Sequence, residues 1–198
     1  MSTNKIRPFV GLILAGGYSS RMGEDKALLE IDGETLLQRN IKLLKQIGAT
    51  DVFVSRNDFS EGSLPDIYPH QEPLSGIHSA LFQSQLCHNS APIIVLPIDM
   101  PLLSEDLLIC LVEAGLTMDN AVHYIEHPLP AFIPNSNLTR EYLEAILSDI
   151  SATKPSRSIR RFLTRIDAVQ LSTGENDKLL NTNPPEQWCD LINSLSRN

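Results

Sequence analysis

The chain has 198 residues, of which 42% are apolar and 20% charged, and its formal net charge is −8. This length suffices for one domain with a sizeable core, so we expect a single domain over residues 1–198. The negative charge argues against a nucleic-acid polymer as partner, because such binding depends on many lysine and arginine contacts with phosphates. Any anionic ligand must therefore be met by a local group of cations.

Cysteine use and the apolar runs predict where the protein works. Cys87, Cys110 and Cys189 are widely spaced and form no Cys-x-x-Cys pair, which disfavours a disulfide framework and a structural zinc site. The apolar run Phe9–Ala15 is short, ends in Gly-Gly and lacks a cleavage site of the secretory kind. No other apolar stretch approaches the length that spans a bilayer. We therefore expect a cytoplasmic protein with free thiols and no membrane contact.

The first third of the chain predicts a strand–helix–strand unit. The apolar run Phe9–Ala15 is typical of a buried parallel strand. Thr35 followed by Gln38 predicts a capping box at the start of a helix, and Gly48 predicts its end. The run Asp51–Ser55 predicts the second strand, which should lie parallel to the first.

The middle of the chain alternates in the same way. A short strand is expected near Ile67-Tyr68, and a helix over Ile77–Gln85. The most apolar strand is expected over Pro92–Ile98 and should be central, with its second proline near the end because proline lacks a donor for the sheet. Ser104 predicts the start of the next helix and Gly115 its end.

The last third predicts two strands and three helices. The strands are expected over residues 121–124 and 131–133, and helices near 139–147 and over 156–166. In the second helix Arg157, Arg161 and Arg165 fall opposite the apolar face. Asn183 and Pro184 predict the start of a C-terminal helix whose apolar residues recur at helical spacing: Trp188, Leu191, Ile192 and Leu195. The alternation of strands and helices predicts one α/β domain with a mostly parallel sheet.

The loop after the first strand predicts a phosphate-binding site. Gly16 and Gly17 free the backbone N–H groups from a neighbouring Cβ, and two cations, Arg21 and Lys26, follow. Oriented N–H groups and cations together suit a polyphosphate. The spacing fits neither a P-loop nor the dinucleotide fingerprint. The alternative is a glycine-rich turn with two solvated basic residues.

Asp99 directly follows the apolar strand Pro92–Ile98. Ligands of open parallel sheets bind beyond the carboxyl ends of the strands, so Asp99 and the Gly16-Gly17 loop should meet if their strands are neighbours. A single carboxylate beside phosphate oxygens suits Mg²⁺. The alternative is a turn or capping role for Asp99.

The segment Leu14–Lys26 resembles the signature Leu-Ala-Gly-Gly-x-(Ser/Gly)-x-Arg-Met-Gly-x-Asp-Lys of nucleotidyltransferases with a Rossmann-like domain. Over nearly its full length the chain resembles the molybdenum cofactor guanylyltransferases, through Pro73-Leu74-Ser75-Gly76, Asp99, the Glu126-His127-Pro128 region and the segment from Asn181 to Glu186. The resemblance implies a three-layer α/β/α fold. It also implies transfer of GMP from GTP to the terminal phosphate of molybdenum-bound molybdopterin, with release of pyrophosphate.

The resemblance also implies roles for particular residues. Lys26 and Arg21 would neutralise the triphosphate, and Asp99 would hold Mg²⁺. Asn181 and Asn183 would contact the acceptor. The nucleotide would be bound by Leu14, Ala15, Gly16, Gly17, Lys26, Ser55, Asn57, Ser75, Gly76 and Asp99. Proteins that deliver the cofactor, or molybdoenzymes that receive it, would be transient partners.

Two departures from the family concern the nucleotide base. Ser55 stands where the family commonly has Asn, although Asn57 matches a further Asn, and the Asp usual before Pro-Leu-x-Gly has no certain counterpart near Pro69 or His70. Guanylyl transfer therefore stands beside two alternatives: cytidylyl or other nucleotidyl transfer to the same or a related phosphorylated acceptor, and a non-catalytic nucleotide-binding module. The face formed by Arg157, Arg161 and Arg165 is either a solvated surface or a receiver for an anionic pterin phosphate or a donor protein.

Overall fold

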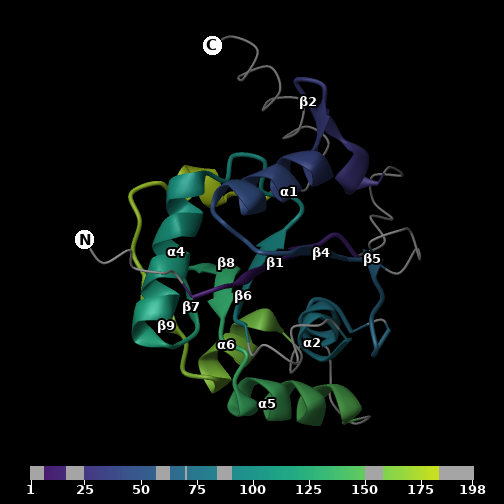
Figure 1. The fold of residues 1–198 in the computed structure, drawn as a ribbon, viewed down its shortest axis with the longest axis vertical. Coiled ribbons are helices and arrows are strands. Elements are labelled where there is room, and N and C mark those ends of the chain that lie inside the picture. The colour runs from purple at the N-terminus through teal and green to yellow at the C-terminus, as the bar shows by residue number, and fades with distance from the viewer. Residues whose placement is uncertain are drawn as a thin grey trace.

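The fold is described from a computed structural model, in which residues 7–16, 25–56, 63–69, 71–83, 91–149 and 158–182 are described. Within these residues one seven-stranded sheet runs in the order β5-β4-β1-β6-β8-β7-β9 (Figure 1). Its strands are β1 (Val10–Leu14), β4 (Val52–Ser55), β5 (Ser63–Leu64), β6 (Ile93–Pro97), β7 (Val122–Tyr124), β8 (His127–Ile133) and β9 (Val169–Leu171). A separate antiparallel pair is formed by β2 (Glu30–Ile31) and β3 (Glu34–Thr35).

The sheet is mostly parallel, as the sequence predicts. Strand β1 lies between β4 and β6 and is parallel to both, and β5 is parallel to β4. Within the described part of this sheet, β8 is antiparallel to both of its neighbours, β6 and β7, while β7 and β9 are parallel. The strand expected from the most apolar run is thus central, and Pro97 lies at its end.

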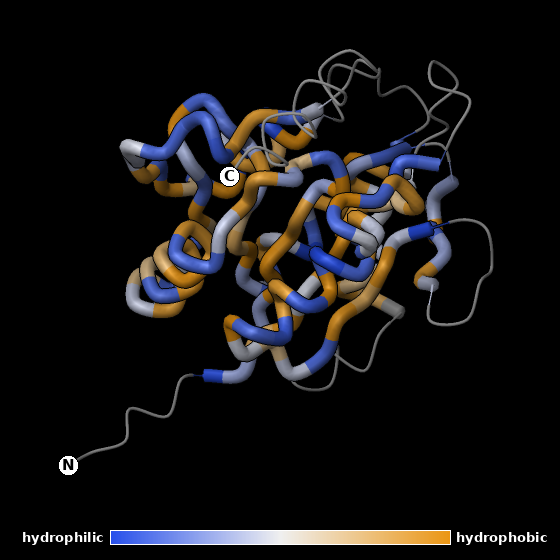
Figure 2. The backbone as a smooth tube through the Cα atoms, turned by 90° about the horizontal axis from the view of Figure 1, so that it is seen from above, coloured by the Kyte–Doolittle hydropathy of each residue, from blue (hydrophilic) through white to orange (hydrophobic). Residues whose placement is uncertain are grey.

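Helices cover both faces of the sheet and give three layers (Figure 1). One face carries α1 (Leu36–Gln46) and α4 (Glu105–Met118), and the other carries α2 (Leu74–Gln83), α5 (Asn137–Ser148) and α6 (Ile159–Arg165). Short 3₁₀ helices, η1 (Lys26–Leu28) and η3 (Asn176–Leu179), complete the described elements. Figure 2 shows hydrophobic and hydrophilic residues alternating along outer helical segments, as expected of helices with one face on a sheet.

Alternate side chains of the central strands enter two separate cores. Ile13 of β1 and Leu96 of β6 pack with α1 and α4, while Leu12 and Val95 pack with α2, α5 and α6. All four are fully buried, which is why these strands read as continuous apolar runs rather than alternating ones. The α/β/α prediction is confirmed.

Several local predictions also agree with the structure. The Thr35 side chain accepts from the Gln38 N–H while the Gln38 side chain accepts from the Thr35 N–H, the two halves of a capping box at the start of α1. Gly48 follows α1 with a φ of 92°, a conformation that favours glycine. Ser104 precedes α4 as expected, but its side chain makes no capping hydrogen bond.

Gly115 does not end α4, so that prediction is wrong. The helix continues to Met118 and ends at Asp119, whose φ is 49°. A Cβ at Gly115 would lie 2.1 Å from Cδ1 of Phe132 in β8, so glycine is required there by close packing. Burial raises the pKa of Tyr124 to about 12, and its hydroxyl donates to the Leu107 carbonyl at 2.7 Å, which also ties α4 to the sheet.

The other differences concern boundaries. The short strand expected at Ile67-Tyr68 lies earlier, at Ser63–Leu64, and α2 begins at Leu74 rather than Ile77. The predicted C-terminal helix lies outside the described residues, as do Gly17, Arg21, Asn57, Arg157 and Asn183. None of the helices in the described ranges is long and apolar enough to cross a membrane.

Candidate active site

The candidate site lies where β1, β4 and β6 end together. Leu14 is in register with Ser55 on one side and with Pro97 on the other. The Ala15 N–H donates to the Ser55 carbonyl at 3.2 Å, so the backbone pairing continues one residue beyond the strand. The carboxyl ends of three neighbouring parallel strands therefore deliver their loops to one edge of the sheet, which is where open α/β sheets bind ligands.

Lys26 and Asp99 meet at this edge. The Lys26 Nζ donates to Oδ2 of Asp99 at 3.3 Å, although the residues are 73 positions apart. Their side chains are only 17% and 16% exposed, so this ion pair is little screened by water. Lys26, the last residue of the signature, therefore meets Asp99 as expected, whereas residues 17–24 of the loop lie outside the described part of the chain.

An ion pair between Asp25 of the signature and Arg56 lies next to Lys26. The Asp25 carboxylate accepts from the Ala27 N–H at 3.0 Å and so caps η1, the helix that Lys26 begins. Arg56, at the end of β4, donates to the same carboxylate. The Asp before Lys26 is a recognisable cap in sequence, whereas nothing local indicates that Arg56 lies beside it.

Gly16 is partly buried at the end of β1. A Cβ built there would lie 3.5 Å from its nearest protein atom, the Ser55 carbonyl oxygen, which is ordinary contact. Packing within the described residues therefore does not demand glycine at this position. A ligand approaching the backbone would demand it, since a side chain would stand in its way.

A second group of polar residues surrounds Asp66, between β4 and α2. The Ser55 hydroxyl donates to Oδ1 of Asp66 at 3.3 Å, and the Ser75 hydroxyl donates to Oδ2 at 2.7 Å. Ser79 in α2 accepts from the Ile67 N–H at 2.8 Å and holds the backbone next to this carboxylate. Asp66 therefore brings a carboxylate to Ser55 and Ser75, and it lies earlier in the chain than Pro69 and His70.

Gly76 brings α2 against the end of β4. A Cβ on Gly76 would lie 2.5 Å from the Ser55 Oγ and 2.9 Å from Cδ2 of Leu14. Ser55 and Ser75 are buried, and Leu14 and Ala15 are partly buried. Five of the expected nucleotide-binding positions therefore form one contiguous patch beside Asp66.

Polar and aromatic side chains form a cluster that joins α2 to α5. The ring of His78, only 1% exposed, lies 2.7 Å from Oε2 of Glu144, and the Tyr68 hydroxyl donates to Oε1 at 2.8 Å. The hydrogen bonds from His78 and Tyr68 lower the pKa of Glu144. His78 also stacks on Phe82, at 4.1 Å between ring centroids. These contacts join α2 to α5 and fix the helix that carries Ser75 and Gly76.

The segment expected to contact the acceptor returns to Asp99. The Thr182 N–H donates to the Asp99 carbonyl at 2.9 Å, and the Thr182 hydroxyl donates to the same oxygen at 3.3 Å. Asn181 is therefore next to a residue bonded to Asp99, and it is exposed. Asn183 lies outside the described residues, so its place is still a prediction.

The donor set suits a magnesium ion that is completed by substrate. Among the described residues no group of three or more His, Cys, Asp or Glu side chains could hold a metal by itself. Mg²⁺ is commonly held by one or two carboxylates together with phosphate oxygens and water. Asp99 could supply such a carboxylate, and the remaining ligands would then come from a bound triphosphate.

These features define a class: a three-layer α/β/α domain whose candidate site lies at the carboxyl end of its first strand. Residues 11–170 match the family model described as the MobA-like NTP transferase domain. The chain is 34% identical over 186 residues to a molybdenum cofactor guanylyltransferase of Xanthomonas euvesicatoria, covering 94% of this chain and 95% of the relative. It is 31% identical to one of Sinorhizobium fredii, with 94% and 91% covered. The chain belongs to the MobA-like NTP transferase family.

Solved structures agree on the fold. Molybdopterin-guanine dinucleotide biosynthesis protein A from Archaeoglobus fulgidus aligns with a TM-score of 0.71 at 20% identity, covering 96% of this chain and 100% of that one. The 2-C-methyl-D-erythritol 4-phosphate cytidylyltransferase from Thermus thermophilus aligns with a TM-score of 0.66 at 17% identity, with 96% and 100% covered. The same architecture thus occurs in a molybdopterin-guanine dinucleotide biosynthesis protein and in a cytidylyltransferase.

Proposed function

We propose that this protein transfers GMP from GTP to the terminal phosphate of molybdenum-bound molybdopterin and releases pyrophosphate. The observation that carries the proposal is the contact between Lys26 and Asp99 at the shared end of β1 and β6. Relatives that match nearly the whole chain bear the name molybdenum cofactor guanylyltransferase. Neither the P-loop nor the kinase motif set, which serve transfer of the γ-phosphate, is present in the sequence.

The reaction forms one phosphorus–oxygen bond and breaks another. An oxygen of the acceptor phosphate attacks the α-phosphorus of GTP, and the bond to the oxygen that bridges the α- and β-phosphates breaks. The electron pair leaves with pyrophosphate. A phosphate monoester has a second pKa of about 6, so the acceptor is largely dianionic at pH 7 and needs no general base.

The residues of the chain position the substrates and stabilise charge. Lys26, together with Arg21, neutralises the triphosphate and the charge that develops on the departing pyrophosphate. Asp99 would hold Mg²⁺, whose charge would polarise the phosphate oxygens. The N–H groups of Ala15, Gly16 and Gly17 bind nucleotide oxygens, and Asn181 with Asn183 orients the acceptor.

Asp66 favours guanine as the base. Guanine presents two adjacent N–H donors, on N1 and on the exocyclic amino group, and a carboxylate can accept both. The Ser55 and Ser75 hydroxyls each donate to one oxygen of Asp66 and so hold its carboxylate at the end of β4. We place the base against Ser55, Ser75 and Gly76, and Asn57 is a further predicted contact.

The proposal includes a magnesium requirement, one domain over residues 1–198, a cytoplasmic location and transient contact with proteins that deliver or receive the cofactor. The test is to incubate the protein with each nucleoside triphosphate, Mg²⁺ and molybdenum-loaded molybdopterin, and to measure pyrophosphate. Release with GTP, abolished by a metal chelator, is expected. Pyrophosphate release with CTP alone would indicate that the protein is a cytidylyltransferase. Nucleotide binding without pyrophosphate release would indicate a non-catalytic nucleotide-binding module.

A further inference from the structure

The short segment from Asp66 to Tyr68 is attached to α2 at three successive residues. The Asp66 carboxylate accepts from the Ser75 hydroxyl at 2.7 Å, and the Ile67 N–H donates to the Ser79 hydroxyl oxygen at 2.8 Å. Tyr68 makes the third attachment through its ring, which packs edge-on against a side chain of α2. The segment belongs to no helix or strand, so side-chain contacts rather than a backbone ladder hold it in place.

Ser79 is the buried member of these contacts. It is 0% exposed, whereas the residue whose N–H it binds, Ile67, is 44% exposed. Ser75 and Ser79 are four positions apart in α2 and therefore lie on one face of the helix. Burial of its own side chain does not hold Ile67, so the hydrogen bond to Ser79 fixes the backbone directly after Asp66.

Glu144 of α5 holds the hydroxyl group of Tyr68. Its Oε1 accepts from that hydroxyl at 2.8 Å, and its Oε2 lies 2.7 Å from Nε2 of His78. Within the described residues the Nδ1 atom of His78 has no hydrogen-bond partner, so the ring proton belongs on Nε2, where it donates to Glu144. Half of the Glu144 side chain is exposed, and these two donors fix its orientation. Through Tyr68, α5 thus contributes to the placement of the segment.

The orientation of Asp66 matters for the choice between two similar bases. In the proposed function its carboxylate accepts from N1–H and from the amino group of guanine. Hypoxanthine has the same N1–H but lacks the amino group. Two parallel hydrogen bonds need a correctly oriented carboxylate, whereas a single bond tolerates a tilt. The preference for guanine over hypoxanthine therefore reports how well Asp66 is oriented.

We propose that Ser79 and Tyr68, the latter through Glu144, are positioning residues that orient Asp66 and so set the preference of the site for guanine over hypoxanthine. Neither residue needs to touch the base, because each acts on the backbone next to the carboxylate. The inference rests on the proposed function for the place of the base. It goes further by assigning base selectivity to side chains of α2 and α5 behind the site.

The test compares the affinities of GTP and of ITP, the nucleotide of hypoxanthine, by calorimetry with Mg²⁺ and without the acceptor. The wild type should bind GTP about tenfold or more tightly than ITP, because a hydrogen bond to a charged group is at stake. Ser79→Ala and Tyr68→Phe should each lower this ratio about threefold or more, mainly by weakening GTP binding. Tyr68→Phe keeps the packed ring, so it tests the hydroxyl group in a folded protein.

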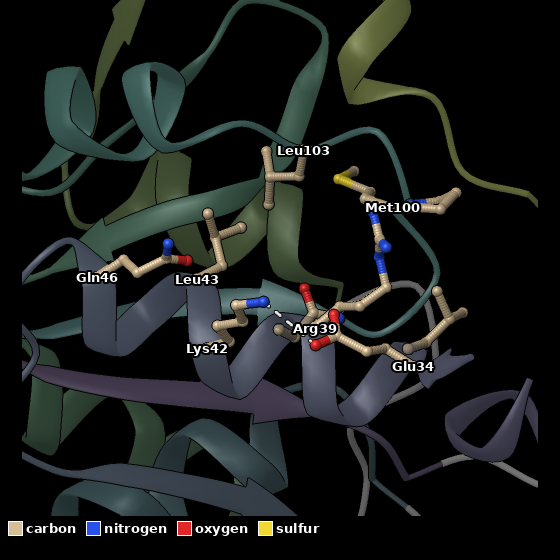
Figure 3. A pocket seen from close by; sticks show the side chains of 10 residues that line it. Glu34, Arg39, Lys42, Leu43, Gln46, Met100 and Leu103 are labelled. Atoms are coloured by element: carbon tan, nitrogen blue, oxygen red, sulfur yellow. Dashed lines mark hydrogen bonds and ion pairs between the residues drawn. The ribbon is translucent and has the colours of Figure 1, made fainter. Parts of the chain in front are cut away.

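Controls separate positioning from a general loss of stability. Ser136→Ala removes the hydroxyl that caps α5, and Tyr142→Phe removes a tyrosine hydroxyl from the same helix. A third control lies on the opposite face of the sheet, in the wall of a pocket of about 250 Å³ beside α1, where Lys42 pairs with Glu34 at 3.2 Å (Figure 3). Lys42→Met breaks this pair. All three controls should leave the ratio of GTP to ITP affinity unchanged.

Substitutions of Glu144 test the path through α5. Glu144→Leu should lower the ratio as Tyr68→Phe does, and the two together should lower it no further, because they remove the same hydrogen bond. Glu144→Gln keeps an acceptor for the Tyr68 hydroxyl and should retain most of the preference.

Two results would overturn the proposal: equal affinities for GTP and ITP in the wild type, or the full preference in a Ser79→Ala or Tyr68→Phe protein whose circular dichroism is unchanged. The measurement does not depend on turnover. A preference that responds as expected, in a protein that releases no pyrophosphate, would support this inference and refute the proposed transfer.

Discussion

Alanine at position 76 would force α2 away from the end of β4. The added Cβ would lie 2.5 Å from the Ser55 Oγ, 3.0 Å from the Ser55 Cβ and 2.9 Å from a Leu14 methyl group. Overpacking of this kind costs about 1–3 kcal/mol. The better helix propensity of alanine returns roughly 0.5–1 kcal/mol. We therefore expect Gly76→Ala to lower the free energy of unfolding by about 1–2 kcal/mol.

A double-mutant cycle tests whether contact with Ser55 causes the loss of stability in Gly76→Ala. Ser55→Gly removes both atoms of the Ser55 side chain that the new Cβ meets, leaving only the Leu14 methyl group, which can rotate. The two substitutions together should therefore cost less than their sum, by about 1 kcal/mol or more, in urea unfolding followed by circular dichroism. Strictly additive free energies would refute this account of the packing between Gly76 and Ser55.

The same variants report on nucleotide binding. Displacing Ser55 breaks its hydrogen bond to Asp66, so Gly76→Ala should weaken GTP binding about tenfold in calorimetry, equivalent to about 1.4 kcal/mol. Gly174→Ala is the control, because a Cβ there meets no atom within 4 Å. Unchanged GTP affinity in the Gly76 variant would show that the guanine base does not bind in this patch.

Three further substitutions test other contacts. Arg56→Met breaks the ion pair that holds the start of η1, and turnover should fall about tenfold while GTP still binds; wild-type turnover would count against a positioning role. Gly115→Ala drives a Cβ into the ring of Phe132 and should cost about 1–3 kcal/mol in urea unfolding, so an equally stable variant would contradict the packing. Hydrogen bonds from His78 and Tyr68 lower the pKa of Glu144 below 4.5, so wild-type stability should fall as the pH drops through that lowered pKa. In Glu144→Gln this decrease in stability should be absent. Its size should be less than about 1 kcal/mol, because half of the Glu144 side chain is exposed. Identical pH profiles of stability for the wild type and the variant would contradict this account.

Structural features that depend only on residues close together in the chain could be predicted from the sequence. The capping box of Thr35 and Gln38, the αL glycine at position 48 and the apolar run of β6 each depend on neighbours in the chain. The meeting of Lys26 with Asp99 was also predictable, because parallel strands bring their carboxyl ends together once β1 and β6 are neighbours.

Structural features that depend on residues far apart in the chain could not be predicted from the sequence. Gly115 reads locally as a helix end, but its packing against Phe132 comes from a strand that follows two elements later. Asp66 carried no local signal of its role, because its partners Ser55 and Ser75 lie 11 and 9 positions away in the chain. Arg56 gave no local signal of its partner, Asp25, 31 positions away.

The central claim is that Lys26 and Asp99 together act on a triphosphate. Its most direct test is the rate of pyrophosphate release from GTP, in the presence of Mg²⁺ and molybdenum-loaded molybdopterin, for Lys26→Met and for the control Lys45→Met on the exposed side of α1. Removing a preorganised charge from the transition state costs about 10²–10³ in turnover, so Lys26→Met should lose at least that factor and the control should lose nothing. A folded Lys26→Met protein that releases pyrophosphate at the wild-type rate would contradict the account.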